Sequence, residues 1–342
     1  MDRISIKCRN LSVIAIACVV AIHSNSLVAE SNSPRWMQVL CDVLFGKLTC
    51  WAVPFFFAAS GYWFGAKECV EGKTFRLRQF YQKKLKTLVV PYVFFVLLGL
   101  ATSIPLAYMQ GVKHGDGMFA HMSLTWDVLG ITELLPYGNG PMWYLRSLIM
   151  LFMLAPLWRL LAVGTKWLLF PMACLAMFSP PLIVEGMIPF RLGQSSFFFL
   201  GLLLSRFHVL STRTRFRSVV VFALVAGAMI AHAECVAGFG VAVSGFLPYV
   251  MLALVWTSYD IIASAEVARP NWLSHYVFWI FGVHIIFLNW LLPPFRAIIR
   301  LPWMSFAMTW FSGAMAFALA VFSAMIAEKA NHGLYSTLSG GR

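Results

Sequence analysis

Long apolar runs recur along the whole 342-residue chain, and short polar segments separate them. Runs of 18 or more apolar residues match the roughly 30 Å hydrocarbon core of a bilayer. The pattern predicts about ten transmembrane helices. Their expected residues are 11–29, 41–65, 88–109, 142–158, 167–184, 190–207, 218–236, 239–260, 275–293 and 303–327. The expected fold class is all-α, a polytopic membrane protein, and the short alternating pattern of an outer-membrane barrel is not what the chain shows.

The composition leads to the same class of protein. Hydrophobic residues make up 60% of the chain, charged residues 11%, and the mean hydropathy is +0.78. A soluble domain carries about a quarter charged residues. The first apolar run is of span length and lacks a clear small-residue cleavage site, so we interpret it as a retained helix rather than a signal peptide. We expect one transmembrane domain over residues 1–330 and a short carboxyl-terminal tail over 331–342.

The net charge of +13 is a topology signal and not a nucleic-acid signal, because the basic residues cluster between the apolar runs. With the amino terminus in the cytoplasm, the segments 66–87, 159–166, 206–217 and 261–274 also lie inside. That side then carries 19 of the 26 Lys and Arg residues, as the positive-inside bias requires. Both termini are therefore expected in the cytoplasm.

The longest polar connection, 110–141, falls outside in this topology. It carries the ionisable residues His114, Asp116, His121, Asp127 and Glu133. Such a loop is either a binding mouth or, more commonly, a solvated connection. The seven cysteines are scattered without a CxxC pair, so we predict neither disulfides nor a metal site.

His23 is the lone ionisable residue of the first apolar run. An ionisable group at membrane depth is costly, and it serves either a functional cavity or an interhelical hydrogen bond. Arg146 and Arg191 also fall within predicted spans and need partners, for which Glu133, Glu185 or an oxyanion are candidates.

Four segments, taken in order, resemble the acyltransferase-3 family of integral-membrane acyltransferases. They are RNLSVIAIACVVAIHS (Arg9–Ser24), VPFFFAASGYWFG (Val53–Gly65), FYQKKLKTLVVPY (Phe80–Tyr92) and GPMWYLRSLIMLF (Gly140–Phe152). Weaker similarities follow at Ser195–Arg206 and Phe278–Phe287, the second of which contains His284. Ser12 stands where the family commonly places an arginine, with Arg9 one turn earlier. Lys84 and Thr87 stand at the positions of its Arg-x-x-Arg pair.

The resemblance implies transfer of an acyl group, often acetyl, from cytoplasmic acyl-CoA to a hydroxyl of an extracytoplasmic or lipid-linked glycan. It also implies a bacterial inner (plasma) membrane location and no permanently bound cofactor. His23 is the implied catalytic residue, acting either as a general base or as an acylated nucleophile. We expect Lys83, Lys84, Lys86 and Arg9 to bind the phosphates of the donor. The expected substrate or cavity residues are Ser60, Tyr62, Trp143, Tyr144, Arg146 and His284.

Several alternatives remain open at this level. The sequence Ser60-Gly61-Tyr62 permits either a helix break or a close backbone approach. The whole chain is also compatible with a transporter or flippase of a glycan or small metabolite, which explains the intramembrane His and Arg residues but not the ordered motifs. The basic segment can equally serve topology and contact with anionic lipid. The sequence leaves the oligomeric state open, homo-oligomers included.

The predicted topology has a direct test. A reporter fused after Arg342 should be active only in its cytoplasmic form. An impermeant thiol reagent applied from outside should label a cysteine introduced at Gly117 but not one at Gly72, each compared with the unsubstituted chain. The reverse labelling pattern would invert the topology.

Overall fold

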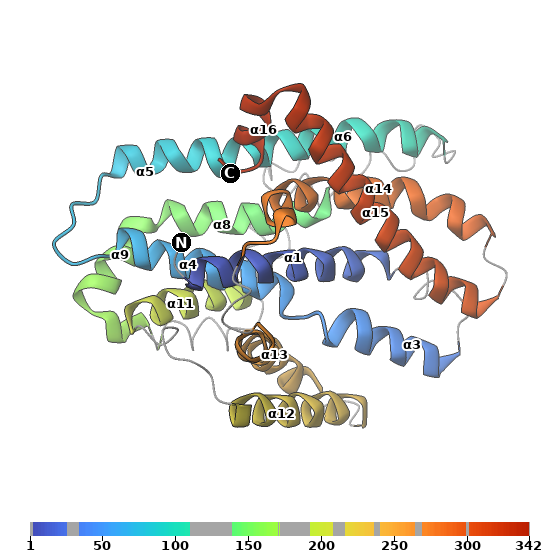
Figure 1. Ribbon diagram of the computed structural model, residues 1–342, viewed down its shortest axis with the longest axis horizontal. Coiled ribbons are helices and arrows are strands. Elements are labelled where there is room, and N and C mark those ends of the chain that lie inside the picture. The colour runs from blue at the N-terminus through green and yellow to red at the C-terminus, as the bar shows by residue number, and fades with distance from the viewer. Residues whose placement is uncertain are drawn as a thin grey trace.

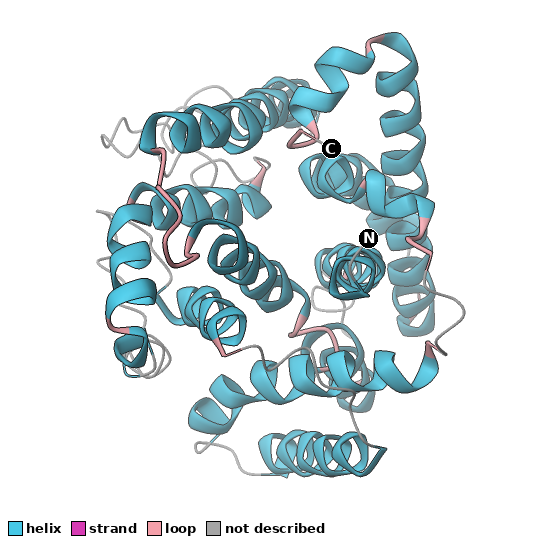
Figure 2. Cartoon of the chain, turned by 60° about the vertical axis from the view of Figure 1, so that its left-hand side comes forward, coloured by secondary structure: helices cyan, strands magenta, loops and turns pink. Residues whose placement is uncertain are grey.

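The computed structural model describes residues 3–25, 34–109, 139–169, 171, 192–207, 216–235, 240–263, 269–298 and 301–341. These residues form helices and connections, with no strand among them (Figures 1 and 2). The first half contains α1 Arg3–Ser24, α3 Arg35–Cys41, η1 Asp42–Lys47, α4 Ala52–Glu68, α5 Leu77–Lys84, η2 Leu85–Val89, α6 Val90–Met109, η3 Gly140–Met142, α8 Trp143–Met153, α9 Ala155–Gly164 and η4 Lys166–Leu168. The second half contains α11 Leu192–Arg206, α12 Phe216–Cys235, α13 Gly240–Ile262, η6 Trp272–His275, α14 Val277–Ile298, α15 Pro302–Ala330 and α16 His332–Leu338.

Five helical segments are long and apolar enough to cross a membrane, or six if the bent pair α8–α9 is one span. The five are Arg3–Ser24, Arg35–Glu68, Leu77–Thr102, Val277–Arg296 and Trp303–Ala330. The apolar parts of α11, α12 and α13 are shorter but overlap three of the expected spans. Most of the expected span 167–184 and of the long connection 110–141 lies outside the described residues. The protein is thus an all-helical, multi-pass membrane protein by its helices, and the total of ten spans remains a prediction.

The helix α1 lies inside the bundle and is in contact with α4, α14 and α15 (Figure 2). Its buried apolar side chains recur with helical spacing at Leu11, Ala15, Ile16, Val19 and Val20. These positions form one broad stripe, as expected for a helix packed on its neighbours. At one edge of the molecule α12 and α13 pack on each other (bottom of Figure 1).

The closest helix pair, α4 with α11, is held together by glycines. A Cβ atom added at Gly61 would overlap the carbonyl of Phe198, and one at Gly201 would overlap the carbonyl of Ala58. Small residues allow two backbones to approach in a membrane, where dispersion rather than hydrophobic exclusion drives packing. Of the two interpretations of Ser60-Gly61-Tyr62, close approach is confirmed, while a helix break is wrong because α4 continues from Ala52 to Glu68.

Several predicted boundaries are wrong because hydropathy marks apolar positions and not the ends of helices. The first helix begins at Arg3 and not at residue 11, so its basic residues are helical. The expected connection 66–87 is shortened to 69–76, since α5 begins at Leu77 and continues through η2 into α6. The Lys83–Lys86 cluster is therefore on helix and not on a loop.

Two further helices differ from the expected pattern. The expected span 142–158 bends by 60° where α8 meets α9, next to Pro156, which removes a backbone donor. The expected span 41–65 is interrupted between η1 and α4, at residues 48–51. Near the carboxyl end, the expected tail contains α16, whose Tyr335 and Leu338 are buried in the core cluster.

Candidate functional site

A cavity of about 730 Å³ lies between α1, α4, α5, α8 and the segment around η6. Its basic residues are Arg9, Lys67, Lys83 and Lys84, against the single carboxylate of Glu68. Serines and aromatic rings make up much of the remaining wall: Ser5, Ser12, Ser60, Ser274, Phe55, Phe56, Trp63, Phe64, Phe80, Tyr144 and Phe152. We call this space the basic cavity. Its charge suits an anionic ligand, and its aromatic wall suits an extended or ring-containing one.

One face of α1 carries both the cavity wall and His23. Ser5, Ser12 and His23 are seven and eleven residues apart, which is close to two and three whole turns of an α-helix. His23 therefore lies about 16 Å further along the helix than Ser12, on the same side. Between them Ile16 is fully buried. The cavity and the histidine thus share one helix face, with apolar side chains separating them.

His23 pairs with a second histidine, His284 of α14. The two ring centroids are 5.3 Å apart. The Nδ1 atom of His284 lies 3.1 Å from the carbonyl oxygen of Ile280 and 2.9 Å from that of Phe281. A carbonyl only accepts, so Nδ1 carries the hydrogen and Nε2 of the neutral ring is the acceptor. This Nε2 is buried and has no hydrogen-bond partner among the described residues, which leaves a lone pair available beside His23.

Aromatic rings connect the basic cavity with the histidine pair. Tyr144, on the cavity wall, packs at 5.4 Å against Phe281, and Phe281 lies 6.1 Å from the ring of His284. Tyr144 also makes an edge contact with Phe57 at 4.8 Å. A ligand that reaches from the cavity to His23 must therefore pass this aromatic wall.

The structure brings together only part of the expected site. Arg9, Lys83, Lys84, Ser60 and Tyr144 line the basic cavity, and His284 lies beside His23. The remaining candidates are placed elsewhere: Lys86 is exposed on η2, Tyr62 packs against Trp63, Trp143 packs against Phe57, and Arg146 is buried within α8. Arg191, Glu133 and Glu185 lie outside the described residues.

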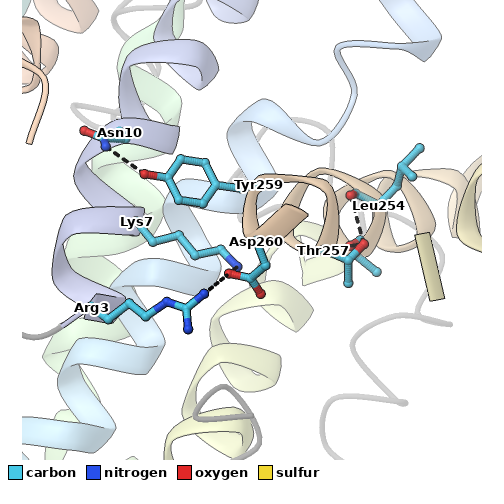
Figure 3. Close-up of polar contacts among 8 residues, drawn as sticks. Arg3, Lys7, Asn10, Leu254, Thr257, Tyr259 and Asp260 are labelled. Atoms are coloured by element: carbon cyan, nitrogen blue, oxygen red, sulfur yellow. Dashed lines mark hydrogen bonds and ion pairs between the residues drawn. The ribbon is translucent and has the colours of Figure 1, made fainter. Parts of the chain in front are cut away.

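The first helix is fixed to α13 by a buried ion pair, drawn in Figure 3. Lys7 Nζ lies 2.9 Å from Asp260 Oδ1, and Arg3 Nη2 lies 3.4 Å from the same oxygen. The Lys7 ammonium also lies 3.8 Å from the centre of the Trp256 ring, a favourable cation–π contact. Lys7 is 3% exposed. The sequence analysis did not single out Lys7 and missed this contact.

One turn further on, Asn10 extends the same contact. Its Nδ2 donates to the hydroxyl of Tyr259 at 2.7 Å and to the carbonyl of Arg269 at 3.2 Å, while its Oδ1 accepts from the backbone N–H of Asn271 at 2.7 Å (Figure 3 shows the Tyr259 bond). These bonds fix the rotation of α1 about its axis. Arg9 and His23 depend on that rotation, because both lie on α1.

Two arginines outside the predicted site hold the connection that follows α4. Arg159 of α9 donates to the carbonyl oxygens of Glu68 and Lys73. Arg206 of α11 donates to the carbonyl of Cys69 at 2.6 Å and to the Glu71 carboxylate at 2.9 Å. Both arginines were counted in the sequence only as topology signals. Their contacts place Lys67 and Glu68 at the cavity rim.

The fold and this site define a multi-pass membrane protein with a cavity lined by basic side chains at one end of its first helix and a buried imidazole pair further along it. A family model for the acyltransferase domain matches residues 11–326, which is most of the chain. The chain therefore belongs to the acyltransferase-3 family, and the resemblance found in the motifs is confirmed. Comparisons with curated proteins and with solved structures gave no match.

The Lys7–Asp260 pair predicts a large loss of stability when one partner is neutralised. Asp260→Asn leaves the buried Lys7 charge without its carboxylate, and breaking such a pair costs about 3–5 kcal/mol. Thermal unfolding in detergent, followed as loss of monodisperse protein, should occur at clearly lower temperature. Arg3→Gln is the matched control, because the Arg3 side chain is 50% exposed. Wild-type unfolding of Asp260→Asn would show that the pair does not fix α1.

Proposed function

We propose that this protein is an O-acyltransferase that takes an acyl group, acetyl in the simplest case, from acyl-CoA in the basic cavity. The acceptor is a hydroxyl of an extracytoplasmic or lipid-linked glycan, and the enzyme resides in a bacterial inner membrane. The observation that carries the proposal is the shared face of α1, with cavity residues Ser5 and Ser12 at one end and His23 towards the other. Membership of the family supports the reaction type.

Donor binding follows from the charge of the cavity. Coenzyme A carries phosphates, and Arg9, Lys83 and Lys84 offer charge-assisted contacts from two different helices. Lys84 Nζ lies 3.6 Å from the centre of the Phe152 ring, so the aromatic wall also stabilises this cation. With the amino terminus in the cytoplasm, the cavity opens on the side where acyl-CoA is made.

We assign the chemical step to the imidazole pair of His23 and His284. A sugar hydroxyl is a weak nucleophile, and a neutral imidazole removes its proton as it attacks the thioester carbonyl. Equally, the imidazole of His23 accepts the acyl group and passes it to the hydroxyl, which divides the transfer into two steps. In either route the coenzyme leaves as the thiol after gaining one proton. His284 Nε2, an acceptor beside His23, can hold the N–H of that ring and so direct its other nitrogen to the substrate.

The separation of cavity and histidines sets a requirement on the donor. Its thioester must reach about 16 Å beyond Ser12 while its phosphates stay at the basic residues. That route is occupied by the side chains of Tyr144, Phe281 and Ile16. These side chains must move aside for an extended pantetheine arm to pass. The site is thus divided, with binding charge at one end and reactive imidazoles at the other.

The test is transfer by the purified protein. Incubation with labelled acetyl-CoA and envelope glycans should move the label to the glycan. A transporter or flippase, the competing function, would move an unmodified solute across a vesicle membrane without such transfer. Label transfer with no glycan transport supports the proposal, and transport with no label transfer overturns it.

His23→Ala should abolish transfer while the protein still inserts and accumulates, because the variant lacks the imidazole that activates the acceptor. Ile14→Ala is the matched control on the same helix, because the Ile14 side chain is 49% exposed and does not line the cavity. Activity is measured as acyl groups transferred per protein in purified membranes. Near-normal activity of His23→Ala would exclude this mechanism.

Of the three lysines in the basic segment, we expect Lys83 and Lys84 to bind the donor and Lys86 not to bind it. Neutralising Lys83, Lys84 and Lys86 together should raise the KM for acyl-CoA much more than that for the acceptor. Because Lys86 is exposed on η2 and does not line the cavity, Lys86→Gln alone should leave the donor KM unchanged, while Lys83→Gln with Lys84→Gln should reproduce the effect. An unchanged donor KM in the double variant would assign this segment to topology alone.

A further inference from the structure

A histidine that neither the motifs nor the proposed chemistry uses lies on the wall of the basic cavity. His275, the last residue of η6, lines the cavity together with Ser274. Its Nε2 lies 3.1 Å from Glu328 Oε1 of α15, and the two side chains are 30% and 26% exposed. The two residues are 53 positions apart, so the contact is a property of the fold.

The carboxylate that meets His275 is itself held in place. The hydroxyl of Tyr276 donates to Glu328 Oε2 at 2.9 Å. A carboxylate only accepts, so the Tyr276 hydroxyl is the donor of this bond. Both oxygens of Glu328 are therefore engaged, one by a ring nitrogen and one by a phenol.

The helix α16 also contacts His275. Tyr335 of α16 is 1% exposed, and its ring lies 5.5 Å from that of His275. Its hydroxyl donates to the backbone carbonyl of His275 at 3.4 Å. The ring of His275 is thus oriented by side chains of α15 and α16 before any ligand arrives, as binding groups are in preorganised sites.

The orientation determines which nitrogen is available to a ligand. A carboxylate only accepts hydrogen bonds, so Nε2 of His275 carries a hydrogen and donates to Glu328. Nδ1 is the nitrogen left for the contents of the cavity. A phosphate, like a carboxylate, only accepts hydrogen bonds, so an imidazole that lies between Glu328 and a phosphate donates from both of its nitrogens. The imidazole then presents a donor, as the neighbouring Arg9, Lys83 and Lys84 do.

We propose that His275, oriented by Glu328, is a further phosphate-binding residue of the donor site, and that Glu328 and Tyr276 are positioning residues. The inference rests on the proposed function, because the phosphate belongs to the nucleotide portion of acyl-CoA. It adds a ligand from the carboxyl-terminal half of the chain to the basic groups of α1, α4 and α5. The donor site is then built from both halves of the sequence.

The test compares two probes, coenzyme A and pantetheine, which lacks the nucleotide and its phosphates. Binding is measured by titration calorimetry on the purified full chain in lipid nanodiscs. His275→Gln is the key variant, because its amide nitrogen can replace Nε2 towards Glu328 but offers nothing in place of Nδ1. We expect it to weaken coenzyme A binding by about tenfold, the size of one charge-assisted contact, and to leave pantetheine binding unchanged.

Two further variants complete the design. Glu328→Gln keeps an oxygen for Tyr276 but removes the charge, and it should also weaken only coenzyme A binding. Lys86→Gln, at an exposed position outside the cavity, should change neither probe. Equal losses for both probes, or wild-type coenzyme A affinity in His275→Gln, would overturn the assignment while leaving the proposed function intact. Failure of the wild-type protein to bind coenzyme A would overturn the proposed function as well.

Discussion

The polar side chains of α1 must be satisfied inside an apolar bundle, and this requirement determines much of the arrangement around it. Lys7 is 3% exposed, and a buried charge or amide without a partner is costly. Lys7 therefore needs Asp260 of α13, and Asn10 needs Tyr259 and the backbone at Arg269 and Asn271. Each contact draws an element from the second half of the chain against the first helix. The same helix then presents Arg9 and His23 in a fixed rotation, so the ion pair at one side of α1 sets the orientation of the candidate site residues on the other.

The class of fold was readable from the sequence, but the helix ends were not. Apolar runs report which residues can face lipid, whereas a helix continues as long as its backbone is hydrogen-bonded. Arg3 to Asn10 and Leu77 to Lys84 are polar and helical, and hydropathy therefore assigned both to connections. The bend after α8 was predictable from Pro156, but hydropathy alone does not take account of a proline. In α4, Gly61 had two interpretations, and only the position of α11 decides between them.

The candidate site was predictable wherever a residue's chemistry was unusual for its place. His23 is a lone ionisable group in an apolar run, and the lysines near α5 form a dense cluster, so both were found. Which of the lysines line the cavity depends on the helix face that each occupies: Lys83 and Lys84 line it, whereas Lys86 does not. The partners of these residues could not be predicted. Glu328 and Asp260 are rare carboxylates in apolar helices, but the sequence does not show which basic residue each one contacts. The packing of α13 brings Asp260 to Lys7, and the packing of α15 brings Glu328 to His275.

The connection after α4 is held mainly through its backbone and not through its side chains. Arg159 and Arg206 hold it mainly through the carbonyl oxygens of Glu68, Cys69 and Lys73. A carbonyl is the same whichever residue supplies it, so most side chains of this connection are free to vary without loss of its shape. Gly72, with φ of 75°, is the exception, because other residues rarely adopt that backbone conformation. Related proteins are therefore expected to differ in the side chains of this connection while they retain the two distant arginines and the glycine. Side chains next to the cavity can then change at little structural cost.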